Sequence, residues 1–260
     1  MIDFSLTDEQ KMLVEMTRSF VEQEMLPHEE TLERTNTLPP ELAAVLKKQA
    51  MELGLHACNL PEEVGGGGLD AVSVMLIEKE LGRTSLALAE CAHRPLNILA
   101  ACEGEQVTQF LEPTIKGEKR DCIAMTEPGA GSDLRGMKCK AVCDGDEWVI
   151  NGEKHFISQA SISDYCVLFA ATGEEETPKG IKQRISAFLV AFDDPGVEVA
   201  PGYRNVSHRG YTNNILRFDN ARIPAWRMMG PEGDGFRLVN EWLGPTRLTV
   251  AATCVARAER

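Results

Sequence analysis

The spacing of the apolar residues changes near residue 120, and this change limits the folds that the chain can adopt. Before it, apolar residues recur every three or four positions, which is the period of an amphipathic helix. From about residue 122 to 218 they alternate or gather in short runs between turn residues, as in strands. Helical spacing returns after Gly230. The pattern predicts an α+β protein in which a helical domain precedes a strand domain.

Helix start and stop signals divide the first 120 residues into five predicted helices. Thr7 and Gln10 form a capping-box pattern that opens the first helix. Pro40 opens the second, because a first helical residue needs no amide hydrogen. Asp70 follows four glycines and caps the third. The five predicted helices cover about residues 8–25, 40–53, 70–83, 85–102 and 105–116.

Tight turns dominate the middle of the chain. Asp144-Gly145 and Asn151-Gly152 both predict hairpin turns. The predicted strands cover about residues 148–150, 154–158, 164–171, 185–192, 197–200 and 214–218. Several short strands joined by tight turns predict a small antiparallel β-barrel or sandwich.

The last 30 residues predict two further helices, one over about 235–243 and one that Pro245 opens. No Gly, Asn or Pro ends the second of these, so we expect the chain to stop at Arg260 inside an element. The resulting domain prediction is an all-α domain at 1–120, a β-barrel domain at 121–230 and the start of a truncated helical bundle at 231–260.

Charge excludes one class of function. The chain carries 40 acidic and 27 basic residues, which gives a net charge of -13. Nucleic acid is therefore a poor ligand, because phosphate binding needs a basic surface. No apolar run approaches the roughly 20 residues that cross a bilayer, and MIDFSLTDEQ lacks the features of a secretion signal. We expect a cytoplasmic protein, or one of another reducing compartment such as the mitochondrial matrix.

The eight cysteines are expected to be core thiols rather than disulfides or metal ligands. Cys139 and Cys143 fall on one face of a period-2 strand together with Met137 and Ala141. The other six lie singly in apolar contexts, at positions 58, 91, 102, 122, 166 and 254. No metal site is predicted.

AMTEPGAGSD, residues 124–133, lies where the helical pattern gives way to strands. Its composition favours an ordinary interdomain turn. The alternative is a binding loop, because Gly129 and Gly131 let the backbone approach phosphate or carbonyl oxygens. Thr126 and Ser132 add hydroxyl donors. The loop does not match G-x-G-x-x-G, and the chain contains no G-x-x-x-x-G-K-[ST].

A binding loop of this kind suits the polar edge and pyrophosphate of a flavin dinucleotide. KHFIS, residues 154–158, could then form the second side of such a flavin site. Phe156 would lie against the flat ring, and Ser158 would donate a hydrogen bond. The local pattern alone favours a different position for Phe156, in the core of the barrel. On the same strand, His155 is expected to face away from the flavin.

Four motifs together resemble the acyl-CoA dehydrogenase family. TEPGAGSD, NGEKHFIS, PEEVGGGGLD and GPEGDGF occur in the order and spacing of that family, and the resemblance runs from Phe4 to Arg260. It implies FAD as cofactor. The resemblance places a set of residues at the flavin, namely Ile123, Met125, Thr126, Gly131, Ser132, Phe156, Ile157 and Ser158.

The resemblance also implies a substrate site. Ser132 and Arg247 would contact an acyl-CoA, Arg247 through its CoA portion. Two positions depart from the family pattern. Phe156 stands where Trp is usual and lacks its N–H donor, and Gly244 stands where an Asp is frequent, which leaves one CoA contact in doubt.

The implied activity is dehydrogenation of an acyl-CoA to the trans-2-enoyl-CoA, as in β-oxidation of fatty acids, with electrons passed through FAD to an electron-transfer flavoprotein. A Glu takes the α proton in that family. Thr246 occupies one of the two positions known for it, and the other is expected beyond Arg260. No catalytic residue is assigned, and we expect little or no activity from these 260 residues.

Two alternatives stay open: an acyl-CoA oxidase-type relative and a catalytically silent flavin-binding or scaffold protein. The family habit implies a homo-oligomer, either dimer or tetramer.

Glu127 and Asp133 are expected to position the loop rather than act as the base, and the turn at His208 is expected to be structural. His93 and Arg94 are placed in the fourth helix, near the acyl tunnel of relatives.

Overall fold

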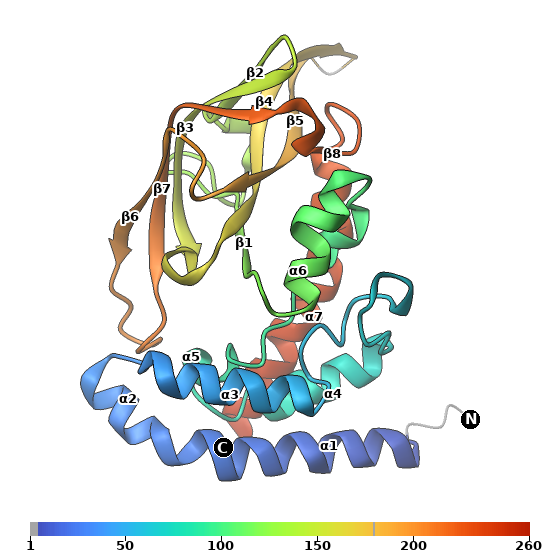
Figure 1. The fold of residues 1–260 in the computed structure, drawn as a ribbon, viewed down its shortest axis with the longest axis vertical. Helices are drawn as coiled ribbons and strands as arrows, with labels where there is room; N and C mark the ends of the chain where they lie inside the picture. The colour runs from blue at the N-terminus through green and yellow to red at the C-terminus, as the bar shows by residue number, and fades with distance from the viewer. Residues whose placement is uncertain (1–4, 179) are drawn as a thin grey trace. The chain divides into compact units, whose positions relative to one another are not determined.

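The computed structural model describes residues 5–178 and 180–260, so residues 1–4, where the resemblance and the first predicted domain begin, lie outside it. The described chain forms two compact units. The first contains the residues up to Pro95 together with Val206–Tyr211 and Leu243–Arg260. The second contains Leu96–Asn205 and Thr212–Trp242. One unit is helical and the other is a β half-barrel, which confirms the α+β class (Figure 1).

The capping signals of the first unit are confirmed. Thr7 Oγ1 accepts from the Gln10 amide at 3.1 Å, and Gln10 Oε1 accepts from the Thr7 amide at 3.2 Å. The Asp70 carboxylate accepts from the Ser73 amide at 2.7 Å. The helices of this part are α1 (Asp8–Phe20), continued by a π-helical turn (Val21–Met25), α2 (Glu29–Thr35), α3 (Pro40–Glu52) and α4 (Ala71–Leu81).

The predicted helix over 85–102 is wrong. Only the four-residue helix α5 (Leu86–Ala89) and a 3-10 turn (Asn97–Ala101) form there. Pro95 prevents a continuous helix, because it lacks an amide hydrogen and disfavours helical geometry in the residue before it. His93 and Arg94 therefore lie outside any helix, and the Arg94 guanidinium is paired with the buried Glu78 carboxylate.

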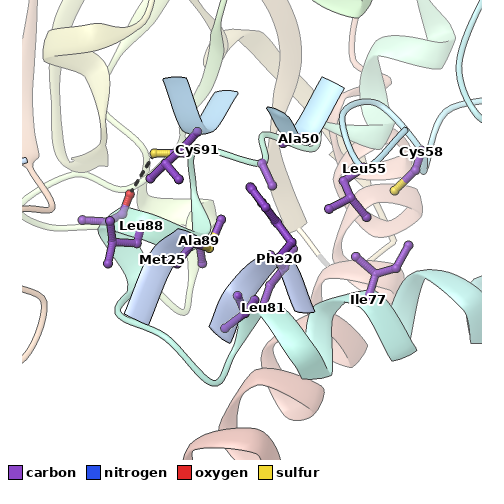
Figure 2. Close-up of a cluster of buried hydrophobic side chains, with 14 of the residues drawn as sticks. Phe20, Met25, Ala50, Leu55, Cys58, Ile77, Leu81, Leu88, Ala89 and Cys91 are labelled. Atoms are coloured by element: carbon purple, nitrogen blue, oxygen red, sulfur yellow. Dashed lines mark hydrogen bonds between the residues drawn. The ribbon is translucent and has the colours of Figure 1, made fainter. Parts of the chain in front are cut away.

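An apolar cluster holds the helices of the first unit together, and Figure 2 shows side chains from separate segments meeting in it. Phe20 and Met25 come from the first helix and its π-helical continuation, Leu55 follows α3, and Ile77 and Leu81 come from α4. All five side chains are buried. Complete burial of one such side chain contributes about 1.5–3 kcal/mol, so this cluster fixes the arrangement of the helices.

Glu80 of α4 is a buried carboxylate that two arginines hold in place. Arg18 donates to it through Nη2 at 2.8 Å and through Nε at 3.0 Å, and Arg83 donates through Nη1 at 3.1 Å. Burial raises the pKa of Glu80, but the hydrogen bonds and charges of Arg18 and Arg83 outweigh burial and leave the pKa below its ordinary 4.5. The carboxylate thus stabilises the folded state in its charged form.

We predict that Glu80→Gln destabilises the protein by about 1–2 kcal/mol at pH 7. A lowered folded pKa gives stability that is present above the unfolded pKa and is lost as pH falls through the folded pKa. The variant and the unchanged protein should therefore converge in urea midpoint as pH falls below 4.5. Glu52→Gln, at an exposed pair with Lys48, is the control. A difference that persists at low pH would contradict this role.

The second unit is built on one curved sheet of eight strands within the described residues. Its order is β6-β7-β3-β2-β4-β5-β8, and β1 pairs with β4 off this path. β4 pairs in parallel with both β1 and β2. The sheet is therefore not the purely antiparallel one predicted. The strands are β1 (Asp121–Ala124), β2 (Lys140–Asp144), β3 (Glu147–Ser158), β4 (Tyr165–Thr177), β5 (Gly180–Ala191), β6 (Val197–Tyr203), β7 (Asn213–Pro224) and β8 (Met228–Met229).

One predicted hairpin is confirmed and the other is wrong. β2 and β3 meet at a tight turn after Asp144, with Gly145 at φ +67°. Asn151 and Gly152 do not turn the chain, because β3 continues through them with a bulge. Gly152 is required by packing, since a Cβ there would lie 2.6 Å from the Cα of Cys139.

Helices in the second unit and at the end of the chain differ in part from the prediction. The helix over 105–116 is confirmed as a π-helical turn (Val107–Leu111) followed by α6 (Glu112–Ile115). The last two predicted helices form one helix, α7 (Gly235–Glu259), with Pro245 inside it. The helix therefore tolerates the loss of one amide hydrogen bond. No helix among the described residues has the length and apolarity that a membrane crossing needs.

Six of the eight thiols lie in the core, as predicted, and all eight are free. The prediction is wrong for Cys143 and Cys254, which are exposed. Cys143 lies near the end of β2 beside the turn, where the inward face of the strand no longer meets a core. Burial raises the pKa of Cys58 and of Cys139 to about 11, so these two thiols are protonated at neutral pH.

Candidate functional site

The segment 125–133, called the glycine loop below, follows β1 and makes a tight turn. The Glu127 amide donates to the Ala130 carbonyl at 2.8 Å, and the Ala130 amide donates to the Glu127 carbonyl at 3.2 Å. Pro128 lies at the turn position that its fixed φ suits. Pro128 and Gly129 are exposed, whereas Glu127 and Ala130 are buried. The loop is therefore anchored at its base and open at its tip.

A buried ion pair attaches the glycine loop to β3. Lys154 Nζ lies 2.8 Å from Glu127 Oε1, and the two side chains are 0% and 3% exposed. Lys154 also donates to the Met125 carbonyl at 3.0 Å. Glu127 accepts from the backbone amides of Lys138 at 2.6 Å and Cys139 at 3.0 Å. The prediction that Glu127 positions the loop is confirmed.

A backbone hydrogen bond joins the same two segments. The His155 amide donates to the Thr126 carbonyl at 2.8 Å. At this point the pairing of β3 with β7 breaks between Lys154 and Ile157, and Phe156 adopts φ +56°. A left-handed conformation costs a residue with a Cβ about 1–2 kcal/mol, and such strain is concentrated at functional sites.

The bulge decides which way the side chains of KHFIS point. Lys154 and His155 are both buried, although they are neighbours in the sequence, and Phe156 is 52% exposed. The interpretation of Phe156 as barrel core is therefore wrong, because it assumed unbroken alternation along the strand. An apolar ring at the surface beside a glycine loop is suited to stack against a flat ligand.

Neither Gly129 nor Gly131 is explained by the fold. Neither has a positive φ, and a Cβ at either position would meet no atom of the described chain within 4 Å. Gly152, by contrast, is required by its neighbour Cys139. The two loop glycines thus leave the backbone of the loop open to a bound molecule, since Gly allows a ligand to approach the backbone.

The structure places all eight predicted flavin contacts in the second unit, around the end of β1 and the end of β3. Ile123, Met125, Thr126 and Ser158 are half-buried, and Gly131 and Ser132 are exposed. Ile157 is 2% exposed, so it can offer a ligand only its backbone. Arg247 and Thr246 belong to the first unit, in helix α7, and Arg247 is exposed.

Two residues of this site were not predicted. For Lys154 the sequence contains one signal: this lysine lies at a position where alternation along the strand predicts an inward-facing side chain. The ring of Tyr203, on β6, stacks on that of Phe156. No signal in the sequence predicts this contact, because the two residues are 47 positions apart. Contacts of that kind depend on sheet order and register.

The four-glycine loop of the first unit is an unsuitable phosphate site. Its amides are used within the chain: Gly66 donates to the Pro61 carbonyl, Gly67 to that of Ala57 and Gly68 to that of Leu60. A Cβ at Gly66 would lie 2.3 Å from the Leu60 carbonyl oxygen, so packing explains that glycine. Among the described residues, no three His, Cys, Asp or Glu side chains are grouped to hold a metal ion.

Comparison with known families agrees with the geometry. The profile described as "Acyl-CoA dehydrogenase, N-terminal domain" matches residues 7–118, and the one described as "Acyl-CoA dehydrogenase, middle domain" matches residues 122–221. The chain belongs to the acyl-CoA dehydrogenase family. The second of these matches contains both the glycine loop and KHFIS.

Relatives of known name support this assignment. The Bacillus subtilis (strain 168) protein named "Probable acyl-CoA dehydrogenase YngJ" is 34% identical over 265 residues, which cover 99% of this chain and 67% of the relative. An acyl-CoA dehydrogenase from Bacillus anthracis, solved in complex with FAD, is 29% identical with a TM-score of 0.84, over 98% of this chain and 43% of that chain. The chain thus spans about two thirds of the length of the family member from Bacillus subtilis.

One similar solved structure carries the name of an electron carrier. It is titled for the electron transferring flavoprotein of Acidaminococcus fermentans and is 27% identical, with a TM-score of 0.82. The alignment covers 99% of this chain and 67% of that chain.

We predict that Lys154→Met destabilises the second unit by about 3–5 kcal/mol, because it leaves the Glu127 carboxylate buried and unpaired. Lys138→Met is the matched control, since Lys138 is exposed and contributes only its amide to Glu127. Urea unfolding measures both, and the double variant with Glu127→Gln should recover part of the loss. Equal stability of Lys154→Met and Lys138→Met would show that the pair does not anchor the loop.

Proposed function

We propose that the glycine loop and the end of β3 bind FAD. The observation that supports this most directly is an exposed ring, Phe156, on a strand that is hydrogen-bonded to a loop containing two glycines that the fold does not require. A flavin needs both features, an apolar surface for its ring and a backbone that can approach its polar edge. The residues present fit the cofactor, and a relative of the same fold is solved in complex with FAD.

Each predicted contact then has a role that suits its position. Met125 and Thr126 follow β1 directly and would meet the ring, together with Ile123. Gly131 and Ser132 are exposed and would lie at the junction of cofactor and substrate. Phe156 and Ser158, at the end of β3, would supply an apolar contact and a donor. The buried Glu127–Lys154 pair holds these two groups of contacts together.

The reaction we propose for the whole protein is α,β-dehydrogenation of an acyl-CoA to the trans-2-enoyl-CoA. FAD, when bound, supplies an acceptor for the β hydrogen as hydride. Arg247 is exposed on α7 and would bind a phosphate of the CoA portion as a cation. A carboxylate must remove the α proton, and we assign none among these residues. Thr246 cannot replace it, because its hydroxyl is not a base at neutral pH.

We further propose partners and a compartment. A solved structure named for an electron transferring flavoprotein aligns with nearly the whole chain, which supports a carrier of that class as the electron acceptor. A homo-oligomer, dimer or tetramer, follows the habit of the family. The eight free thiols agree with a reducing compartment, either cytoplasm or mitochondrial matrix.

We predict that Gly129→Ala and Gly131→Ala each weaken FAD binding by about tenfold or more, because a methyl group takes up the space at the backbone. Neither change should lower the stability of the unbound protein, since the methyl group meets no atom of the chain. Titration of the protein with FAD, followed by flavin fluorescence, measures the affinity. Gly244→Ala, equally open but in α7 of the first unit, is the control.

Two results would count against the proposal. Absence of FAD binding by the unchanged chain would contradict it directly. Unchanged affinity in both loop variants, alongside binding by the unchanged chain, would place the cofactor elsewhere.

A further inference from the structure

Phe156 does not stand alone at the surface, because the ring of Tyr203 stacks on it. The ring centroids are 4.1 Å apart and the planes differ by 14°. Both side chains are exposed, Phe156 by 52% and Tyr203 by 40%. The two rings are thus nearly parallel and in direct contact. Tyr203 therefore covers one face of Phe156 and leaves much of the pair open to a ligand.

The two rings meet although β7 lies between their strands in the sheet order. Irregular pairing on both sides of β7 makes this possible, with one break between Lys154 and Ile157 and another between Ala200 and Tyr203. Gly202 permits a close approach, since a Cβ there would lie 1.9 Å from the Asn213 carbonyl oxygen. Bulges commonly redirect side chains near active sites.

Polar contacts hold the hydroxyl end of Tyr203. The Tyr203 hydroxyl lies 2.6 Å from His155 Nδ1, and His155 Nε2 lies 2.5 Å from Glu153 Oε1. Arg217 Nε donates to the other oxygen of Glu153 at 3.0 Å. The Tyr203 ring is thus fixed at its hydroxyl end, while its face is presented to Phe156.

We propose that Tyr203 is a positioning residue of the flavin site, which acts by holding the ring of Phe156 in the orientation that stacks on FAD. This inference rests on the proposed function. An exposed Phe at a bulge would otherwise exchange between rotamers, and binding would have to immobilise it. Tyr203 immobilises the ring in advance, so its contribution to FAD affinity passes through Phe156.

Two substitutions of Tyr203 separate the stack from the hydrogen bond. Tyr203→Leu removes both and should weaken FAD binding by about 3- to 10-fold. Tyr203→Phe keeps the ring, loses only the contact to His155, and should stay within about twofold of the unchanged protein. Affinity is measured by FAD titration, and the visible circular dichroism of the bound flavin reports the environment of its ring. We expect that spectrum to change in Tyr203→Leu and to persist in Tyr203→Phe.

A double-mutant cycle tests whether Tyr203 acts through Phe156. In a Phe156→Leu background, Tyr203→Leu should cause no further loss of affinity, because the ring that it positions is absent. Additive losses would overturn the inference, as would equal losses in Tyr203→Phe and Tyr203→Leu. If the unchanged protein binds FAD and Tyr203→Leu has the same affinity and the same spectrum, the inference is overturned while the proposed function is not. Absence of FAD binding by the unchanged protein would overturn the proposed function and the inference together.

Discussion

The ion pair between Glu127 and Lys154 is the interaction on which the candidate site depends. Its two side chains come from segments 27 residues apart and are almost completely buried. Burial of two charges costs several kcal/mol per ion, so such a pair is weak evidence for stability. Its hydrogen bonds to Met125, Lys138 and Cys139 restrict the position of both partners. We infer that the pair fixes the position of the glycine loop on β3.

Other irregular features lie directly beside this pair. The β3 strand breaks its pairing immediately after Lys154, and Phe156 takes a left-handed conformation there. Because Lys154 and His155 are both buried, Phe156 is exposed. The same region holds two glycines that no packing contact explains. Strain, an exposed ring and unexplained glycines in one place indicate a binding surface rather than a fold requirement.

Local signals in the sequence predicted local structure well. The capping box at Thr7, the cap at Asp70 and the hairpin after Asp144 all depend on residues within a few positions of one another. The failures depend on distant partners. Asn151-Gly152 forms a bulge and not a turn because Cys139 packs against it. Phe156 is exposed because the buried Lys154 shifts the alternation of inward and outward side chains along the strand. The glycine loop and KHFIS could be recognised in the sequence, whereas the stack of Tyr203 on Phe156 could not.

Amide hydrogen exchange of the protein, with and without FAD, tests the central claim that residues 125–133 and 154–158 form one cofactor site. The account predicts slower exchange in both segments when FAD is added, with the hairpin turn at Gly145 and Asp146 unchanged as an internal control. Slower exchange in only one segment would contradict the claim that the ion pair joins them. Unchanged exchange in both, at FAD concentrations that saturate binding, would show that the cofactor binds elsewhere.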